Sequence, residues 1–116
     1  MAKLYWKSTC TTCRAARTVA REAAGASLEE RNYAKEPLTE AEVAELVDLA
    51  GGVAAVLSTR TAEAKERGWT AASPPARDVY VRAAAANNNL VRRPIVVAGD
   101  RVVVGNDAAA IRAALG

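Results

Sequence analysis

The sequence predicts an α/β fold: a mixed four-stranded sheet with helices on both faces and a helical region inserted in its middle. Two observations indicate this architecture. Near the N-terminus the pattern runs strand–helix–strand, and a right-handed crossover would make those two strands parallel. Near the C-terminus a β-hairpin pattern is followed by a helix. The 116 residues suit one domain, which we expect to span 1–116 with the helical insertion at about 38–88.

The N-terminal part is predicted to form a strand, a helix and a second strand. The first strand is expected over 3–6 and the second over 27–33. Between them, apolar residues recur at helical spacing, at Ala16, Val19, Ala20 and Ala23. We expect this helix to end at Gly25, because glycine is common just past a helix C-terminus.

The middle of the chain is predicted to be helical. Thr39 and Glu42 have the spacing of a capping box, in which the side chain of each residue accepts the backbone N–H of the other. The helix that follows would end at Gly51. One or two short helices are expected within 53–68, and a weak helix is expected over 76–86 before a turn at 87–89.

The C-terminal part carries the strongest hairpin pattern in the chain. Two apolar runs, 94–98 and 101–104, flank Gly99 and Asp100, and such a pair suits a two-residue turn with positive φ. Asn106 or Asp107 is expected to cap a last helix. This order of elements resembles the thioredoxin-like plan with helices inserted in its middle.

Composition narrows the chemistry. Hydrophobic residues make up 51% and charged residues 25% of the chain, which is typical of a globular protein. There is no histidine, which excludes Ser–His and Cys–His nucleophile pairs and histidine metal ligands. With two cysteines, one chain cannot form a four-cysteine zinc or iron–sulfur site. We therefore expect no metal and no cofactor.

Charge and hydropathy suggest where the protein works. No apolar run approaches the ~20 residues that span a bilayer, and the N-terminus lacks the apolar segment of a signal peptide. We therefore expect a cytoplasmic protein without a membrane partner. The net charge of +3 is too slight to predict direct nucleic-acid binding. The basic residues of 1–21 suit an anion or a thiolate near the cysteines.

Cys10 and Cys13 form a C-x-x-C motif between a predicted strand and a predicted helix. The N–H groups and the dipole at a helix N-terminus stabilise a thiolate. We therefore assign Cys10 as the nucleophile and Cys13, one turn further, as the resolving thiol. Arg14 would add positive charge, and Thr11 and Thr12 would shape the site. Two alternatives remain: the cysteines merely pack in the core, or they bind a metal together with a second chain.

The segment Arg92-Arg93-Pro94 precedes the third predicted strand. Proline is tolerated at the first residue of a strand, where its missing N–H is not needed. In a thioredoxin-like plan this proline faces the cysteines and is typically cis. Arg93 would then offer paired N–H donors to an oxyanion. The alternative is that Arg92 and Arg93 are surface residues at a strand edge.

Taken together, several short motifs resemble the arsenate reductase/Spx family of thioredoxin-fold proteins over nearly the whole chain. These motifs are Lys3-Leu4-Tyr5, Ser8-Thr9-Cys10-Thr11-Thr12-Cys13-Arg14, Leu57-Ser58-Thr59-Arg60-Thr61, Leu90-Val91-Arg92-Arg93-Pro94-Ile95 and Val104-Gly105-Asn106-Asp107. For an arsenate reductase, the resemblance implies that Cys10 attacks arsenate while Arg14 and Arg93 hold the oxyanion. Arg60 and Arg92 would be further anion-binding residues.

The chain departs from the arsenate reductase pattern at three positions. Trp6 stands where those enzymes have a histidine, Gly105 where they have another arginine, and Ser58 in the nearest register for the mid-chain arginine. The C-x-x-C, Ser58-Thr59-Arg60 and Arg92-Arg93-Pro94 resemble the Spx branch more closely. That branch consists of redox-controlled transcription regulators that bind the C-terminal domain of the RNA polymerase α subunit.

We therefore expect a thiol–disulfide redox protein of the arsenate reductase/Spx family, with Pro94 shaping the site of Cys10 and Cys13. One alternative is a redox-sensing regulator that binds the RNA polymerase α subunit. Another is an arsenate reductase, with glutathione, glutaredoxin or thioredoxin as its thiol donor.

Overall fold

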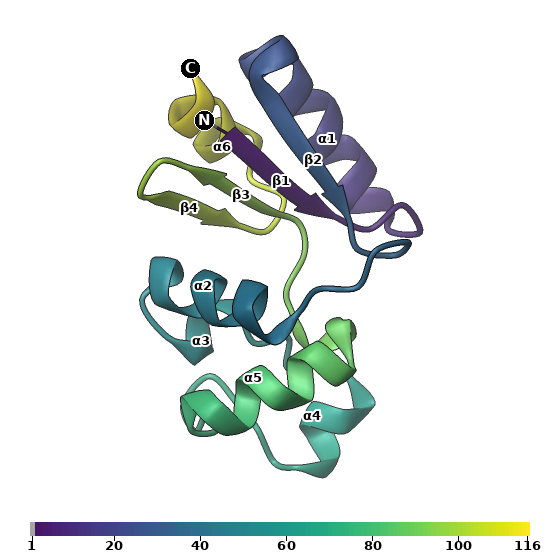
Figure 1. Ribbon diagram of the computed structural model, residues 1–116, viewed down its shortest axis with the longest axis vertical. Helices are drawn as coiled ribbons and strands as arrows, with labels where there is room; N and C mark the ends of the chain where they lie inside the picture. The colour runs from purple at the N-terminus through teal and green to yellow at the C-terminus, as the bar shows by residue number, and fades with distance from the viewer. Residues whose placement is uncertain (1) are drawn as a thin grey trace. The chain divides into compact units, whose positions relative to one another are not determined.

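The computed structural model describes residues 2–116, and its residues group into two units (Figure 1). The first, here called the sheet unit, combines the chain up to Glu36 with Arg93–Gly116. The second, the helical unit, is Pro37–Arg92 and includes the 38–88 region expected to be an insertion. That the whole chain folds as one domain stays a prediction.

The sheet unit contains four strands in the order β2-β1-β3-β4. These are β1 (Ala2–Trp6), β2 (Leu28–Asn32), β3 (Ile95–Ala98) and β4 (Arg101–Val104). β1 and β2 are parallel and joined by helix α1 (Thr11–Ala24), whereas β1–β3 and β3–β4 are antiparallel. The predicted mixed four-stranded sheet is confirmed.

The β3–β4 hairpin turns at the predicted place. Ala98 pairs with Arg101, which leaves Gly99 and Asp100 as the two turn residues. Gly99 has a φ of +64°, a conformation that glycine adopts at no steric cost. The final helix, α6 (Ala108–Leu115), begins at Asp107, whose carboxylate accepts the Ala110 N–H at 3.1 Å.

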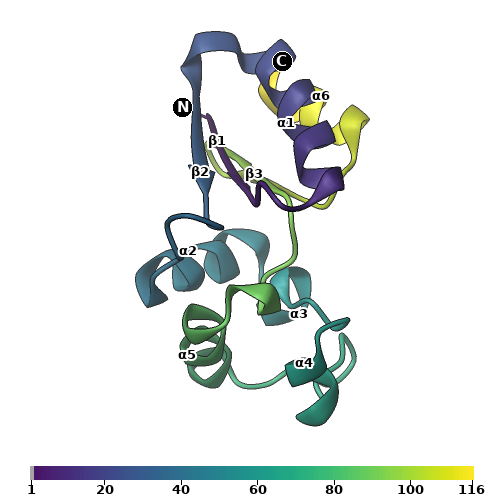
Figure 2. The ribbon, with the colours of Figure 1, turned by 90° about the vertical axis from the view of Figure 1, so that its right-hand side faces the viewer.

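Helices α1 and α6 pack against each other on one face of the sheet (Figure 2). The small side chains of Ala16 and Ala20 let α1 approach the sheet closely, and both are fully buried. A single core joins the two helices to β1 and β3, made of Leu4, Trp6, Cys13, Ala16, Ala20, Val96 and Ile111. Helix cover of the second face of the sheet stays a prediction.

The helical unit contains α2 (Glu40–Ala50), α3 (Val53–Val56), α4 (Ala62–Glu66) and α5 (Arg77–Ala86), followed by a 3-10 turn at Asn88–Leu90. The predicted capping box is present: Thr39 Oγ1 accepts the Glu42 N–H and Glu42 Oε1 accepts the Thr39 N–H. α2 ends at Gly51 in the left-handed conformation, with a φ of +93°. Within residues 2–116, no helix has the length and apolar character needed to cross a bilayer.

Tyr80 ties the helical unit together. Its side chain is fully buried, and its hydroxyl donates to the Leu90 carbonyl at 2.8 Å, with the Val56 carbonyl 3.3 Å away. These two carbonyls also accept the N–H groups of Ser58 and Arg92, respectively, each at 2.8 Å. The Tyr80 hydroxyl therefore stabilises the isolated β-bridge between Leu57 and Val91, which joins two segments that are distant in the sequence.

We predict that Tyr80→Phe lowers the free energy of unfolding by about 0.5–1.5 kcal/mol, the usual net worth of a buried neutral hydrogen bond. The loss stays this small because both carbonyls keep their backbone donors. Urea denaturation followed by circular dichroism measures it. A loss above about 3 kcal/mol would contradict this account of the site.

Candidate functional site

Cys10 lies at the N-terminus of α1, between the end of β1 and the first helical residue, Thr11. It is the N-cap residue, with the extended backbone angles φ −104° and ψ 120° that such a position requires. Its Sγ accepts the backbone N–H of Cys13 at 3.4 Å and lies 3.1 Å from Thr12 Oγ1. A cysteine thus occupies the place where a serine or threonine oxygen usually caps a helix.

The loop before Cys10 is held by side chains and backbone together. The Cys10 N–H donates to the Lys7 carbonyl at 3.0 Å, which closes a turn after β1. Asn32, at the end of β2, accepts the N–H groups of Ser8 at 3.2 Å and Ala34 at 3.1 Å with one oxygen. Arg14 donates to the Ser8 carbonyl at 3.1 Å. Arg14 therefore fastens the loop, and its predicted charge effect on Cys10 stays a prediction.

Cys10 is a partly exposed thiol with increased acidity. Burial opposes its ionisation, but hydrogen bonds from Thr12, Cys13 and Arg93 outweigh that effect and lower the pKa from 9.0 to about 7. A pKa of about 7 makes the thiolate form well populated near neutral pH. The thiolate is the nucleophilic form of cysteine.

Cys13 has the opposite character. Its side chain is fully buried against Leu4 and Ala16 in the core beneath α1. Burial, reinforced by the hydrogen bond and the charge of Cys10, raises the pKa of Cys13 to about 12. The two thiols are both free, and they differ by several pKa units although they are three residues apart.

Arg93 reaches the cysteines from the start of β3. The peptide bond between Arg93 and Pro94 is cis, as the thioredoxin-like plan implied, and Pro94 is fully buried. The guanidinium acts on Cys10 through a hydrogen bond and on Cys13 through its charge. The structure thus brings four of the predicted residues together: Cys10, Thr12, Cys13 and Arg93.

Other predicted site residues lie elsewhere. Thr11 is exposed and begins α1. Arg60 and Arg92 are exposed residues of the helical unit, and their anion-binding role stays a prediction. Within residues 2–116, no three His, Cys, Asp or Glu side chains form a cluster that would hold a metal ion.

The site contains two further residues that were not predicted from the sequence. Asn32 fixes the loop before Cys10, and Tyr33 directly follows Asn32 in the chain. Burial strongly raises the pKa of Tyr33, and the charge of Arg93 opposes that shift. The signal available in the sequence was positional, because both residues end the strand predicted to be parallel to the first one. Residues at the carboxyl ends of neighbouring parallel strands meet at one edge of the sheet.

Trp6 is the residue that the family resemblance compares with a histidine of arsenate reductases. It is a core residue at the end of β1, and the Arg17 guanidinium lies 4.2 Å from its ring centroid. Arg17 and Arg21 both pair with the Glu30 carboxylate, and together they lower the pKa of Glu30 although burial opposes them. The cation–π contact with Arg17 thus stabilises the position of the Trp6 ring.

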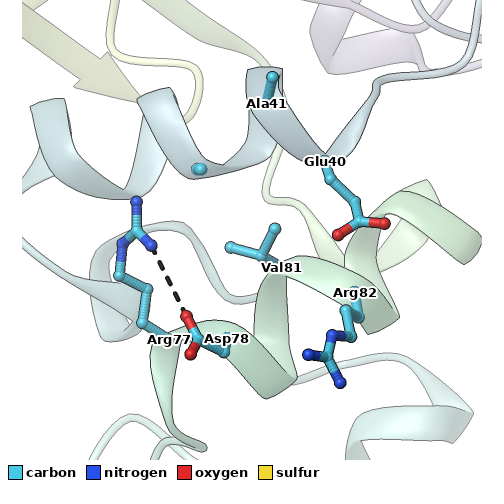
Figure 3. A pocket seen from close by; sticks show the side chains of 7 residues that line it. Glu40, Ala41, Arg77, Asp78, Val81 and Arg82 are labelled. Atoms are coloured by element: carbon cyan, nitrogen blue, oxygen red, sulfur yellow. Dashed lines mark ion pairs between the residues drawn. The ribbon is translucent and has the colours of Figure 1, made fainter.

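A hollow on the helical unit has a different character (Figure 3). It lies between α2 and α5 and is lined by Glu40, Ala41, Ala44, Arg77, Asp78, Val81 and Arg82. Arg77 is already paired with Asp48 at 2.9 Å and with Asp78 at 3.8 Å. The lining contains ion-pairing side chains, whereas both cysteines belong to the sheet unit.

Comparison with known proteins identifies the class that this fold and cysteine pair define. A profile of the ArsC family matches residues 5–114. The chain is 32% identical over 113 residues to the global transcriptional regulator Spx of Bacillus subtilis, covering 97% of this chain and 85% of Spx. It is 34% identical over 118 residues to an uncharacterised protein of the glnII region of Streptomyces viridochromogenes, covering 97% and 98%.

The fold is shared with solved structures. The arsenate reductase from Vibrio cholerae superposes with a TM-score of 0.82 at 21% identity, covering 98% of this chain and 97% of that one. A second structure, from Yersinia pestis, superposes with a TM-score of 0.76 at 21% identity, covering 96% of this chain and 97% of that one. The protein has a thioredoxin-like fold of the arsenate reductase type. It belongs to the ArsC family, and its adjacent cysteines support a thiol redox protein.

We predict that iodoacetamide modifies Cys10 with a rate that rises with pH and is half-maximal near pH 7. At pH 7 the thiolate fraction is about fifty-fold higher than for a thiol of pKa 9, and the rate follows the thiolate. Cys13 stays unmodified below about pH 10 because it is buried and its pKa is about 12. Peptide mass spectrometry assigns the modified cysteine.

Cys10→Ala and Cys13→Ala variants provide the control, since each retains one thiol. Faster modification of Cys13 than of Cys10 at neutral pH would reverse the assigned roles.

Proposed function

We propose that this protein is a thiol–disulfide oxidoreductase in which Cys10 is the nucleophile and Cys13 the resolving thiol. The observation that carries the proposal is the arrangement at the N-terminus of α1. Cys10 Sγ is partly exposed and accepts the Cys13 N–H at 3.4 Å, while the Cys13 thiol is buried directly behind it. An acidic outer thiol and a protected inner one are what stepwise disulfide exchange requires.

The exchange proceeds in two steps. The Cys10 thiolate attacks one sulfur of a substrate disulfide, which forms a mixed disulfide and releases the other sulfur as a thiolate. Cys13 then loses its proton to solvent and attacks Cys10 Sγ. This step forms the Cys10–Cys13 disulfide and releases the second substrate thiolate. Two electrons pass from the cysteine pair to the substrate.

The two thiols are coupled electrostatically, and this coupling favours attack by Cys10 first and by Cys13 second. After burial, the hydrogen bond and charge of Cys10 are what keep the pKa of Cys13 high. Once Cys10 is in a mixed disulfide, its thiolate charge is gone, whereas the opposing charge of Arg93 remains. The pKa of Cys13 therefore falls at the stage at which Cys13 has to attack.

Turnover requires a thiol that reduces the Cys10–Cys13 disulfide again. Glutathione, with or without glutaredoxin, and thioredoxin are the donors that the family resemblance implies. Attack on the exposed Cys10 sulfur is favoured, because the sulfur of Cys13 is fully buried.

A second candidate function is redox-controlled regulation of transcription through the RNA polymerase α subunit. The 32% identity to Spx favours it, together with the shared C-x-x-C and Arg92-Arg93-Pro94 segments. In this case the disulfide would be a switch rather than a step of turnover. Pull-down with the purified C-terminal domain of the α subunit, using reduced and oxidised protein, tests it; binding that depends on the redox state supports the regulator.

We predict that Cys10 and Cys13 form a reversible intramolecular disulfide under mild oxidation with oxidised glutathione. Thiol counting gives two free thiols in the reduced protein, none after oxidation and two again after dithiothreitol. In the Cys13→Ser variant, the reaction stops at a mixed disulfide on Cys10, visible as an added glutathione by mass spectrometry.

The matched control is Cys10→Ser, which retains the buried thiol and is expected to stay unmodified. Two free thiols that persist in the wild-type protein under oxidant would contradict the oxidoreductase proposal.

We predict weak or absent arsenate reduction. Gly105 provides no guanidinium, Ser58 stands in the register of another arginine, and Trp6 is buried and clamped by Arg17. Each lost charged contact removes about 1.5–3 kcal/mol, so two together reduce transition-state binding by on the order of a hundredfold or more.

The assay follows arsenate-dependent oxidation of a coupled thiol donor, with Cys10→Ser as the blank. Robust turnover that disappears in Cys10→Ser would place arsenate reduction ahead of general disulfide exchange.

A further inference from the structure

Tyr33 is a buried polar residue beside the cysteines to which the proposed mechanism gives no task. It directly follows β2, and its N–H donates to the Trp6 carbonyl at 3.0 Å, which continues the parallel pairing of Trp6 with Asn32. This pairing places Tyr33 at the edge of the sheet where β1 leads into the cysteine loop. Only 4% of Tyr33 is exposed.

The Tyr33 hydroxyl is fully buried and has no hydrogen bond of standard length among residues 2–116. Buried hydroxyls without partners destabilise a fold and are rare. Phenylalanine would fill the same space without that penalty. Packing alone therefore does not account for a tyrosine at this position, and the charged group near its hydroxyl suggests a further role.

The side chain that acts most directly on this hydroxyl is Arg93. Its guanidinium charge and N–H groups lie close enough to affect the acidity of Tyr33, and the same guanidinium acts on Cys10. Arg93 thus acts on both Tyr33 and Cys10. A guanidinium has five N–H donors in a rigid plane, so it can hydrogen-bond a hydroxyl on one side and a sulfur on the other.

We propose that Tyr33 is a positioning residue whose hydroxyl orients the Arg93 guanidinium toward the Cys10 sulfur. The proposal rests on the proposed function of Cys10 as the nucleophile. Arginine side chains have many rotamers, and holding one of them costs conformational entropy. A neutral oxygen at a fixed place near the guanidinium favours one of these rotamers.

Protonation chemistry fits this task. Burial raises the pKa of Tyr33 far above neutrality, so the phenol stays neutral and its oxygen presents lone pairs to Arg93 without forming an ion pair. The positive charge of Arg93 is then available to the thiolate. The groups that lower the pKa of Cys10 are Thr12 and Cys13 on α1 and Arg93 before β3. Tyr33, which follows β2, is coupled to Arg93 and to both cysteines.

The test is the pH profile of Cys10 alkylation by iodoacetamide in Tyr33→Phe, compared with the wild-type chain. We expect the midpoint to rise by about half a pH unit, because the thiolate loses part of its stabilisation by Arg93. The rate at pH 7 then falls about twofold. The free energy of unfolding is expected to stay equal or increase, since the buried Tyr33 hydroxyl makes no hydrogen bond of standard length to any described residue.

Tyr80→Phe is the matched control, because it removes the buried hydroxyl of the helical unit and is expected to leave the alkylation profile unchanged. Arg93→Ala is expected to raise the midpoint at least as much as Tyr33→Phe. In the Tyr33→Phe/Arg93→Ala double variant, the loss of the hydroxyl is expected to add nothing further, since a residue that acts through another shows this non-additivity.

Two outcomes would overturn the role of Tyr33 while leaving the proposed function intact. The first is an unchanged midpoint in Tyr33→Phe when Cys10 of the wild type titrates near pH 7. The second is a full additional shift in the double variant, which would mean that Tyr33 acts independently of Arg93. A wild-type midpoint near pH 9 would instead contradict both the nucleophile assignment and the positioning role.

Discussion

The whole site depends on one constraint: the chain must turn from the end of β1 into the first turn of α1 within a few residues. That turn places Cys10 at the N-cap, where the free N–H groups of the helix face its sulfur. It also places Cys13 one turn later on the face of α1 that packs into the core. The same backbone geometry therefore produces an outer thiolate and an inner, protected thiol.

The parallel pairing of β1 with β2 supplies the second half of the site. Because Trp6 pairs with Asn32, the residues just after the two strands lie at the same edge of the sheet (Figure 1). Asn32 then fixes the loop through the Ser8 N–H, and Tyr33 lies beside Arg93. The sheet thus orders both the backbone around Cys10 and the positive charge that stabilises its thiolate.

Local patterns were sufficient to predict most of the fold. The capping box of α2, the hairpin turn at Gly99 and the N-terminal position of Cys10 all depend on residues close in sequence. Asn32 and Tyr33 could not be assigned in this way, because their roles depend on the register between β1 and β2. Arg14 illustrates the reverse case: it is near Cys10 in sequence, but its guanidinium bonds the Ser8 carbonyl.

The contrast between the cysteines suits thiol chemistry in a chain without histidine. A histidine would activate a nucleophile by accepting its proton. Here hydrogen bonds from Thr12, Cys13 and Arg93 instead stabilise the thiolate directly, so solvent accepts the proton and no general base is needed. The same arrangement provides no base for the second thiol, since a guanidinium or a backbone N–H cannot take a proton from Cys13. In the proposed exchange, attack by Cys13 therefore depends on the loss of negative charge at Cys10 that accompanies the first step.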